Sequence, residues 1–173
     1  RGAERFGAQT LYAEVTGLSL AENPKRLQTS EGEIQAGAVI IATGAAPRPL
    51  GLPEEVTYQG RGVAYCATCD GMFYKDKVVA VAGGGNSAAE DALTLAKLCK
   101  KVYLVHRREK LRAVKSYQEL LEQADSVEFV WNRKISGLVG EKKLEGLKVE
   151  NVQTGESELL PVDGLFVAIG RIP

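Results

Sequence analysis

The sequence lacks the features of a membrane or secreted protein. Its longest apolar runs fall well short of the ~20 residues that span a bilayer, and residues 1–5 do not read as a signal peptide. Three cysteines are too few for a disulfide-stapled secreted domain. Because 22 basic and 22 acidic residues cancel, neither nucleic acid nor an anionic membrane is expected as the main partner. We therefore expect a cytoplasmic protein that binds neither.

Methionine is also scarce, since Met72 is the only one and the chain begins with Arg1. The sequence ends at Pro173, directly after a strongly apolar run. We interpret it as an internal piece of a longer protein. With 173 residues, of which 45% are hydrophobic and 25% charged, the piece can form one ordinary globular domain or one and a half small ones.

Apolar runs predict an α/β fold. Continuous runs typical of strands buried on both faces occupy residues 38–42, 78–82, 102–105 and 165–169. Between the second and third runs, residues 88–99 repeat apolar side chains with a helical period, opened by Ser87 and Glu90 as a capping box. Strand, glycine turn, helix and strand then form one βαβ unit of about 30 residues.

The remaining segments divide the chain into two unequal parts. After a helix over 113–124 and a strand over 127–131, an antiparallel meander is expected over 135–139, 144–152 and 157–160. This predicts a Rossmann-like three-layer domain with a parallel sheet and a β-meander. Residues 54–65 read as irregular. The N-terminal part has strand patterns over 10–15 and 26–29 but one poor helix, so it is expected to be an incomplete domain, ending near Pro47 and Pro49.

Cys66 and Cys69 form a C-x-x-C pair that is followed at once by Asp70. Such a pair is either a redox-active dithiol or half of a zinc site. A zinc site needs four ligands, and only Cys99 and His106 remain as further candidates, with Cys99 on the apolar face of the expected helix. For redox chemistry each thiol resolves the other, and Asp70 is positioned to carry protons. Asp70 as a helix or turn cap is the alternative.

The second motif is a glycine turn that matches G-x-G-x-x-G/A from Gly83 to Ala88. The first glycine permits the tight turn, the second lets the backbone approach a pyrophosphate, and the small third residue lets helix and strand pack closely. The turn follows an expected strand and opens an expected helix, which is the context that supports a dinucleotide site. We therefore expect a nucleotide to be bound by Gly83, Gly84, Gly85, Asn86, Ser87, Ala88 and Glu90. A glycine turn without a ligand stays open.

The end of the next strand indicates which nucleotide. NAD sites usually carry an acid there for the ribose 2′-hydroxyl, whereas this chain has His106, Arg107 and Arg108, with Arg112 one turn further. Arginines suit a 2′-phosphate, so we infer NADPH over NADH. A solvated basic loop is the alternative. His106 is the only histidine, and a local or ribose-flanking role is favoured over catalysis.

A hydride donor and a disulfide need an intermediary that accepts hydride and passes electrons to sulfur, and a flavin is the ordinary one. The sequence has no second G-x-G-x-x-G, so the phosphate loop of the flavin is expected to lie outside it. These motifs together resemble the low-molecular-weight, bacterial-type thioredoxin reductases. The resemblance rests on residues 40–45, the hexapeptide from Cys66 to Gly71, residues 83–90, the arginine cluster with Ala113, and residues 164–170.

The resemblance implies an FAD-binding domain interrupted by an NADPH-binding domain. Residues 1–46 would be part of the first, residues 47–170 the second, and residues 171–173 the start of the return linker. It further implies that Thr43 and Gly44 contact FAD, and that Ile169 and Gly170 contact NADPH. Since the flanking FAD segments are absent from the sequence, this chain alone is expected to bind FAD poorly or not at all.

The resemblance also implies a reaction. NADPH reduces FAD, the flavin reduces the Cys66–Cys69 disulfide, and the dithiol reduces thioredoxin. Cys69 would face the flavin, Cys66 would attack thioredoxin and Asp70 would handle protons, in a full-length homodimer whose domains rotate about the two connectors. Two alternatives stay open: a flavoprotein that reduces a peroxiredoxin, whose relatives lack the arginine cluster, and a non-catalytic redox or zinc module.

Overall fold

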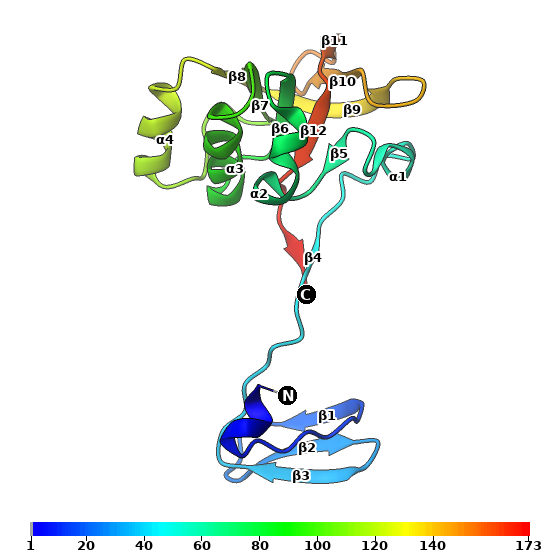
Figure 1. Cartoon of the computed structure of the whole chain (residues 1–173), viewed down its shortest axis with the longest axis vertical. Helices are drawn as coiled ribbons and strands as arrows, with labels where there is room; N and C mark the ends of the chain where they lie inside the picture. The colour runs from blue at the N-terminus through cyan, green and yellow to red at the C-terminus, as the bar shows by residue number, and fades with distance from the viewer. Residues whose placement is uncertain (1) are drawn as a thin grey trace. The chain divides into compact units, whose positions relative to one another are not determined.

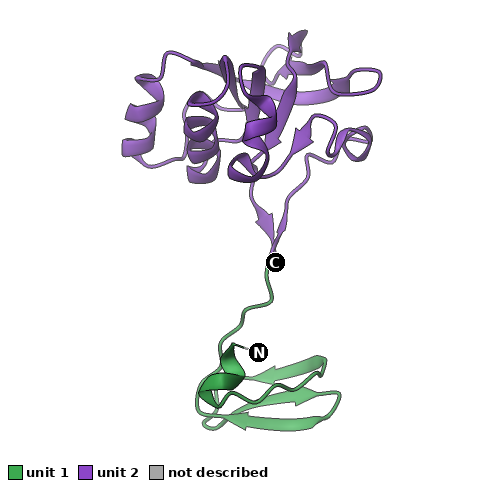
Figure 2. Cartoon of the chain, in the orientation of Figure 1, with its two compact units in different colours: residues 1–44 green, residues 45–173 purple. Residues whose placement is uncertain are grey.

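A computed structural model describes residues 2–173 of the chain. It comprises two compact units, which divide between Gly44 and Ala45 (Figure 2). The two units are described separately below. No helix in the described range 2–173 has the length and apolar character needed to cross a membrane.

The first unit is a small antiparallel sheet. A 3-10 helix, η1 (Ala3–Phe6), precedes the three strands, which pair in the order β1-β2-β3. The strands are β1 (Val15–Ser19), β2 (Lys25–Thr29) and β3 (Gly32–Ala36). The strand predicted over 26–29 is confirmed as β2, whereas the one predicted over 10–15 begins only at Val15 and continues beyond the prediction. No residue from Gly2 to Gly44 is fully buried, so the described part of this unit has no closed core.

The buried strand predicted over residues 38–42 is wrong. These residues are irregular, and Ile40 and Ile41 are 92% and 62% exposed. An apolar run becomes a buried strand only where a neighbouring strand pairs with it and another layer covers it. The part of the chain that the structure describes places no strand beside this run.

The second unit is built on a five-stranded sheet in the order β5-β12-β6-β7-β8 (Figure 1). Each described pair of neighbouring strands in this sheet is parallel. The strands are β5 (Val63–Ala64), β6 (Val78–Ala82), β7 (Lys101–His106), β8 (Val127–Trp131) and β12 (Gly164–Val167). The predictions over 78–82 and 127–131 match β6 and β8 residue for residue. The two other buried runs are confirmed with shifted ends as β7 and β12.

Two core clusters cover the two faces of this sheet. On one face Val79, Val81 and Leu104 pack with Ala92 and Leu95 of a helix. The helices of the unit are α1 (Glu55–Tyr58), α2 (Ala67–Asp70), α3 (Asn86–Ala96), α4 (Lys115–Glu122) and the 3-10 helix η2 (Gly71–Tyr74). The predicted helices over 88–99 and 113–124 are α3 and α4. Residues 54–65, expected to be irregular, contain the short elements α1 and β5.

The opposite face of the sheet is covered by the meander. Here Ala80, Ala82 and Leu165 pack with Leu138 and Leu147. The meander strands, β9 (Arg133–Val139), β10 (Gly146–Asn151) and β11 (Ser157–Pro161), pair antiparallel in the order β11-β10-β9, as predicted. The fold is therefore an α/β arrangement of three layers. A two-residue ladder between β4 (Ala46–Pro47) and β13 (Arg171–Ile172) joins the two connecting segments of the unit.

The predicted capping box at the start of α3 is wrong. Gly85 is the N-cap residue, and no side chain caps the helix. Ser87 therefore lies inside the first turn, and both Ser87 and Glu90 are exposed. The helix starts two residues before the position that the sequence pattern predicts, so the Ser-x-x-Glu spacing is out of register with the cap.

Candidate functional site

Cys66 and Cys69 are joined by a disulfide at the start of α2, with 5.3 Å between their Cα atoms. Cys66 is the N-cap residue of α2, and its sulfur accepts a hydrogen bond of 3.2 Å from the Cys69 N–H. Cys66 is half-buried and Cys69 is exposed. The disulfide is therefore within reach of another molecule while the helix holds both sulfurs in place.

The surroundings of the disulfide favour redox chemistry over a metal site. Cys99 is buried in the core, where burial raises the pKa of its thiol to about 11. Across residues 2–173 no cluster of three or more histidine, cysteine or acidic side chains is arranged to hold a metal ion. Asp70 is the last residue of α2, and its side chain makes no capping hydrogen bond to η2. The alternative assignment of Asp70 as a cap thus finds no support.

The glycine turn between β6 and α3 is shaped by its neighbours. Gly83 has a φ of +155°, and a Cβ there would lie 2.5 Å from the Ala168 carbonyl oxygen and 2.7 Å from the Ala88 Cβ. A Cβ on Gly84 would collide with the His106 ring. Position 83 thus requires glycine, and the fully buried Ala88 must be small, as the sequence motif predicts.

The same turn is hydrogen-bonded to residues 107–114, the loop between β7 and α4, which is called the arginine loop below. The Gly84 carbonyl oxygen accepts hydrogen bonds from the backbone N–H groups of Arg112 at 2.6 Å and Ala113 at 3.1 Å. The Asn86 Oδ1 atom accepts one from the Val114 N–H at 2.9 Å. Because these three bonds join the two segments, the glycine turn fixes where the arginine loop lies.

We expect Gly84→Ala to destabilise the protein by about 1–3 kcal/mol, the usual cost of overpacking a buried site. The new methyl group would occupy the space of the His106 ring. The free energy of unfolding, measured in urea, tests this. The double variant Gly84→Ala/His106→Ala should recover part of the loss because the ring is gone, and two additive losses would contradict the explanation.

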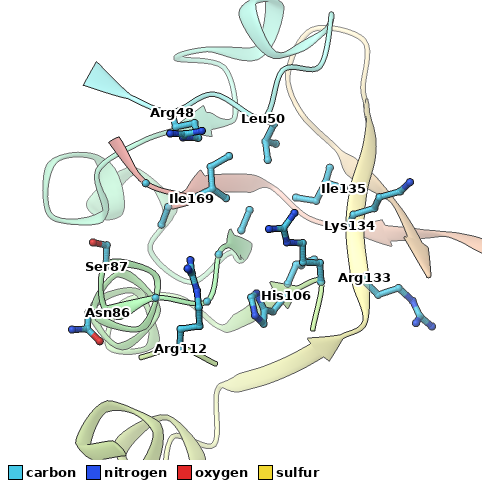
Figure 3. A pocket seen from close by; sticks show the side chains of 18 of the residues that line it. Arg48, Leu50, Asn86, Ser87, His106, Arg112, Arg133, Lys134, Ile135 and Ile169 are labelled. Carbon is cyan, nitrogen blue, oxygen red and sulfur yellow. The ribbon is translucent and has the colours of Figure 1, made fainter. Parts of the chain in front are cut away.

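A groove of about 890 Å³ opens above the glycine turn (Figure 3). One side is formed by the start of α3, and another by the end of β7 and the loop that follows it. In Figure 3, Arg112 and His106 lie on one side of the open space, Lys134 and Ile135 on a second, and Ile169 on a third. The lining residues are Arg48, Leu50, Ala82, Gly83, Gly84, Gly85, Asn86, Ser87, Val105, His106, Arg107, Arg112, Val114, Arg133, Lys134, Ile135, Ala168, Ile169 and Gly170.

The lining of this groove is strongly basic. It contains five cationic side chains and no carboxylate. Two of them are neutralised by ion pairs, Arg133 with Glu158 at 3.0 Å and Lys134 with Glu150 at 2.8 Å. Within residues 2–173 no ion pair involves the other three, Arg48, Arg107 and Arg112. The groove therefore suits an anionic ligand.

His106 forms part of the groove wall but is itself only 7% exposed. Its Nε2 atom has no hydrogen-bond partner among the described residues, and its ring meets Trp131 edge-on with 6.4 Å between centroids. Burial, followed by the positive charges of the neighbouring arginines, lowers the pKa of His106 despite a hydrogen bond with the Lys110 backbone. Folding therefore favours the neutral form of the His106 imidazole.

We expect this lowered pKa to make the protein less stable in acid. The unfolded chain binds a proton at His106 near pH 6.5, whereas the folded chain resists it. Below pH 6.5 the unfolded state thus binds more protons, and the free energy of unfolding falls as the pH decreases. Denaturant titrations between pH 5 and 7.5 should show a smaller acid loss in His106→Gln. Since His106 is the only histidine, an equal loss in both proteins would contradict this account.

Comparison with known proteins relates this pairing of a disulfide and a basic groove to a family. The pattern of the family described as pyridine nucleotide-disulphide oxidoreductase matches residues 4–173. The chain belongs to the pyridine nucleotide-disulphide oxidoreductases. Among relatives in this family, thioredoxin reductase of Streptomyces coelicolor is 46% identical over 172 residues, and that of Listeria monocytogenes is 39% identical over 173. Each alignment covers 99% of this chain but only 53% and 54% of the relative.

Solved structures of thioredoxin reductases are also similar to this chain. Thioredoxin reductase of Lactococcus lactis matches with a TM-score of 0.82 at 36% identity, over 98% of this chain and 56% of its own. The enzyme of Giardia duodenalis matches with a TM-score of 0.82 at 33% identity, with the same coverage. The chain therefore spans about half the length of the family members it matches.

The structure brings most of the predicted nucleotide-binding residues of the chain together. Ten of them line the groove: Gly83, Gly84, Gly85, Asn86, Ser87, His106, Arg107, Arg112, Ile169 and Gly170. Three do not. Ala88 is buried beneath the turn, Glu90 is exposed on α3, and Arg108 lines an adjacent hollow of about 520 Å³. Thr43 and Gly44, predicted for FAD, are exposed and irregular and line neither hollow.

Sequence reasoning missed several groove residues from distant segments. Arg48 and Leu50 come from the segment after β4, while Arg133, Lys134 and Ile135 come from β9. The Arg48 N–H donates to the Gly170 carbonyl oxygen at 2.9 Å. Arg48 lies between two prolines, and Arg133 and Lys134 are a basic pair in the meander. Neither sequence pattern indicates that these residues line the same groove.

Glu55 is a buried carboxylate that binds the segment of Leu50 through hydrogen bonds. It is only 4% exposed, yet all its acceptors have donors: the N–H groups of Leu50 at 3.0 Å and Gly51 at 2.9 Å, and the Tyr65 hydroxyl at 2.6 Å. Burial and the hydrogen bond to Glu55 raise the pKa of Tyr65. Because Tyr65 directly precedes Cys66, this carboxylate joins the groove segment to the segment that enters the disulfide.

Proposed function

We propose that this chain is the NADPH-binding and dithiol-bearing part of a thioredoxin reductase. The observation that carries the proposal is the groove in which Arg107 and Arg112, and no carboxylate, surround a glycine turn in the same unit as an accessible disulfide. The relatives named thioredoxin reductase support it, because the alignment with them covers nearly the whole chain. The activity itself belongs to the full-length protein.

The residues present fit NADPH. The pyrophosphate would be bound by the backbone N–H groups from Gly84 to Ser87, at the positive end of the 11-residue helix α3. Arg107 and Arg112 would bind the 2′-phosphate, since both line the groove and are free of ion pairs with other described residues. Arg48, on the Gly170 side of the groove, would add a third cation for the phosphates.

The disulfide would supply the reducing end of the reaction. Once reduced, the Cys66 thiolate attacks the thioredoxin disulfide to form a mixed disulfide and release one thiol. Cys69 then attacks Cys66, which re-forms the Cys66–Cys69 bond and releases reduced thioredoxin. Asp70 is the adjacent carboxyl group for the protons that this exchange moves. Met72 and Phe73, 65% and 74% exposed directly after α2, offer an apolar surface to a protein partner.

FAD is assigned to the full-length protein. A flavin supplies the conversion of a hydride into electrons that reduce a disulfide. We assign residues 1–46 to the FAD-binding domain, with Thr43 and Gly44 as FAD contacts. Thr43 and Gly44 are exposed and irregular, so they do not form an FAD site by themselves. The full-length protein is proposed to bind FAD, to act as a homodimer and to reduce thioredoxin in the cytoplasm.

Nucleotide binding to the 173-residue chain tests the proposal directly. Trp131, the only tryptophan, contacts His106 in the groove wall, so its fluorescence should respond to a bound nucleotide. We expect NADPH to bind at least about tenfold more tightly than NADH, because one charge-assisted contact to the 2′-phosphate already supplies that ratio. Equal affinities would contradict the assignment to NADPH.

A further inference from the structure

The carboxylate of Glu55 is explained by neither the nucleotide motif nor the dithiol motif. Within residues 2–173 it belongs to the only acidic side chain that is buried. No cation forms an ion pair with it in this described range. A carboxylate is costly to bury, and without a cation it depends on hydrogen bonds to replace the water it has lost. The groups that donate these hydrogen bonds therefore indicate what the carboxylate does.

Two of these donors belong to an irregular segment, residues 48–51, which directly follows β4. The segment carries three backbone N–H groups, since Pro49 has none. The N–H of Leu50 donates to Glu55 Oε1 at 3.0 Å, and that of Gly51 donates to Glu55 Oε2 at 2.9 Å. The third N–H, at the start of the segment, donates to the carbonyl group just before β13. One carboxylate thus binds the segment as a neighbouring strand would.

Residues 48–51 form one wall of the groove, which is called the 48–51 wall below. Arg48 and Leu50 both line the groove, and Figure 3 shows them across the open space from Arg112 and His106. In the proposed binding mode the arginine loop binds the 2′-phosphate and the glycine turn binds the pyrophosphate. The half of the dinucleotide beyond the pyrophosphate therefore extends towards the 48–51 wall, where the half-buried Leu50 offers an apolar surface to its ring.

We propose that Glu55 is a positioning residue for nucleotide binding, which fixes the 48–51 wall for the nicotinamide half of NADPH. The inference rests on the proposed binding of NADPH. Glu55 lines neither hollow, so it acts through the backbone of Leu50 and Gly51 and not through contact with the ligand. A wall that is already fixed does not have to be ordered when the ligand binds, and this strengthens binding. The adenosine half, bound at the opposite side, gains nothing from it.

The test compares two ligands that share only the adenosine half. Adenosine 2′,5′-bisphosphate carries the 2′-phosphate but no nicotinamide riboside, whereas NADPH carries both. Glu55→Gln keeps the size of the side chain, but its amide nitrogen cannot accept from an N–H group, so one bond to the 48–51 wall is lost. In calorimetric titrations of the 173-residue chain, we expect this variant to bind NADPH about tenfold more weakly, because fixing one freed residue costs about that factor. Its affinity for the bisphosphate should stay within about threefold of the wild-type value.

Matched variants separate this role from general effects. Glu54→Gln makes the same chemical change at the exposed neighbouring position, where the side chain makes no capping hydrogen bond, and should leave both affinities unchanged. Tyr65→Phe removes the third donor to Glu55 but keeps both bonds to the 48–51 wall, so its affinity for NADPH should stay within about threefold of the wild-type value. If Glu55→Gln does not fold, as judged by circular dichroism, Glu55→Asp replaces it. The shorter side chain cannot reach both N–H groups and should show the same selective loss.

A selective loss of NADPH affinity in the folded Glu55 variant supports the inference. Equal weakening of both ligands, or no weakening, would overturn it. Failure of both Glu55 variants to fold would also overturn it, because the carboxylate would then serve the stability of the unit. The wild-type titrations with NADPH and NADH report on the proposed function separately, since they involve no change at Glu55. A wild-type chain that prefers NADPH, together with an unselective Glu55 variant, would therefore leave the proposed function intact and remove only the role of Glu55.

Discussion

Replacing Arg107 and Arg112 together by glutamine is expected to weaken NADPH binding about a hundredfold or more and to change NADH binding only a few fold. Hydrogen bonds to charged groups contribute about 1.5–3 kcal/mol each, so losing two of them corresponds to a factor of 10² or above. NADH lacks the 2′-phosphate and loses little. Titration of the chain with each nucleotide, followed by Trp131 fluorescence, gives both dissociation constants.

The structure refines this experiment by separating the three arginines. Arg107 and Arg112 line the groove, whereas Arg108 lines only the adjacent hollow, so Arg108→Gln should have a smaller effect than either of the others. Arg61→Gln, at an exposed position that lines neither hollow, controls for the loss of one positive charge. If both nucleotides weakened equally, the two arginines would serve the shared pyrophosphate, and the assignment of the 2′-phosphate would be wrong.

Cys66→Ser and Cys69→Ser are each expected to abolish thioredoxin reduction by the full-length protein, with a loss of at least about a thousandfold, and to spare the reduction of its flavin by NADPH. Either substitution removes one sulfur of the only disulfide in the described chain, so no dithiol can form. Turnover with thioredoxin and the bleaching of the flavin absorbance are measured separately. Cys99→Ala, which removes the buried free thiol, is the matched control and should keep turnover.

The two cysteine variants also distinguish the roles of the sulfurs. The probe is a thioredoxin with a single cysteine activated as a mixed disulfide with thionitrobenzoate. The remaining thiol displaces thionitrobenzoate and forms a mixed disulfide with thioredoxin. We expect Cys69→Ser to react, because Cys66 remains, and Cys66→Ser to react much more slowly. A faster reaction of Cys66→Ser would reverse the roles and make Cys69 the sulfur that attacks thioredoxin. Cys69 is the more exposed of the two cysteines in this structure.

Local patterns were sufficient for two strands of the second unit. The runs over 78–82 and 127–131 became β6 and β8 without a shift of either end. The central strand β6 is apolar throughout, as is typical of a strand buried on both faces. The same rule failed for residues 38–42, where Ile40 and Ile41 are exposed. An apolar run indicates that a segment can be buried, but the segment becomes a buried strand only where a neighbouring layer covers it.

The candidate site was predictable where one segment carries the whole motif. Gly83 and the small Ala88 follow from a turn whose atoms are within six residues of one another, and the Cys66–Cys69 disulfide spans only three. The contacts of Gly84 were not predictable in this way. The His106 ring that forbids a side chain there comes from the next strand, 22 positions along the chain.

The sequence by itself determined the chemistry of this protein: a dithiol pair, a glycine turn that suits a pyrophosphate, and arginines in place of an acid at the end of the following strand. Short-range motifs suffice for these because the reacting or binding atoms are neighbours in the chain. The tertiary structure alone decided which distant groups join them. It placed Arg48 in the groove and hydrogen-bonded Glu55 to Leu50 and Tyr65. Such contacts depend on how layers pack, and no local pattern records that.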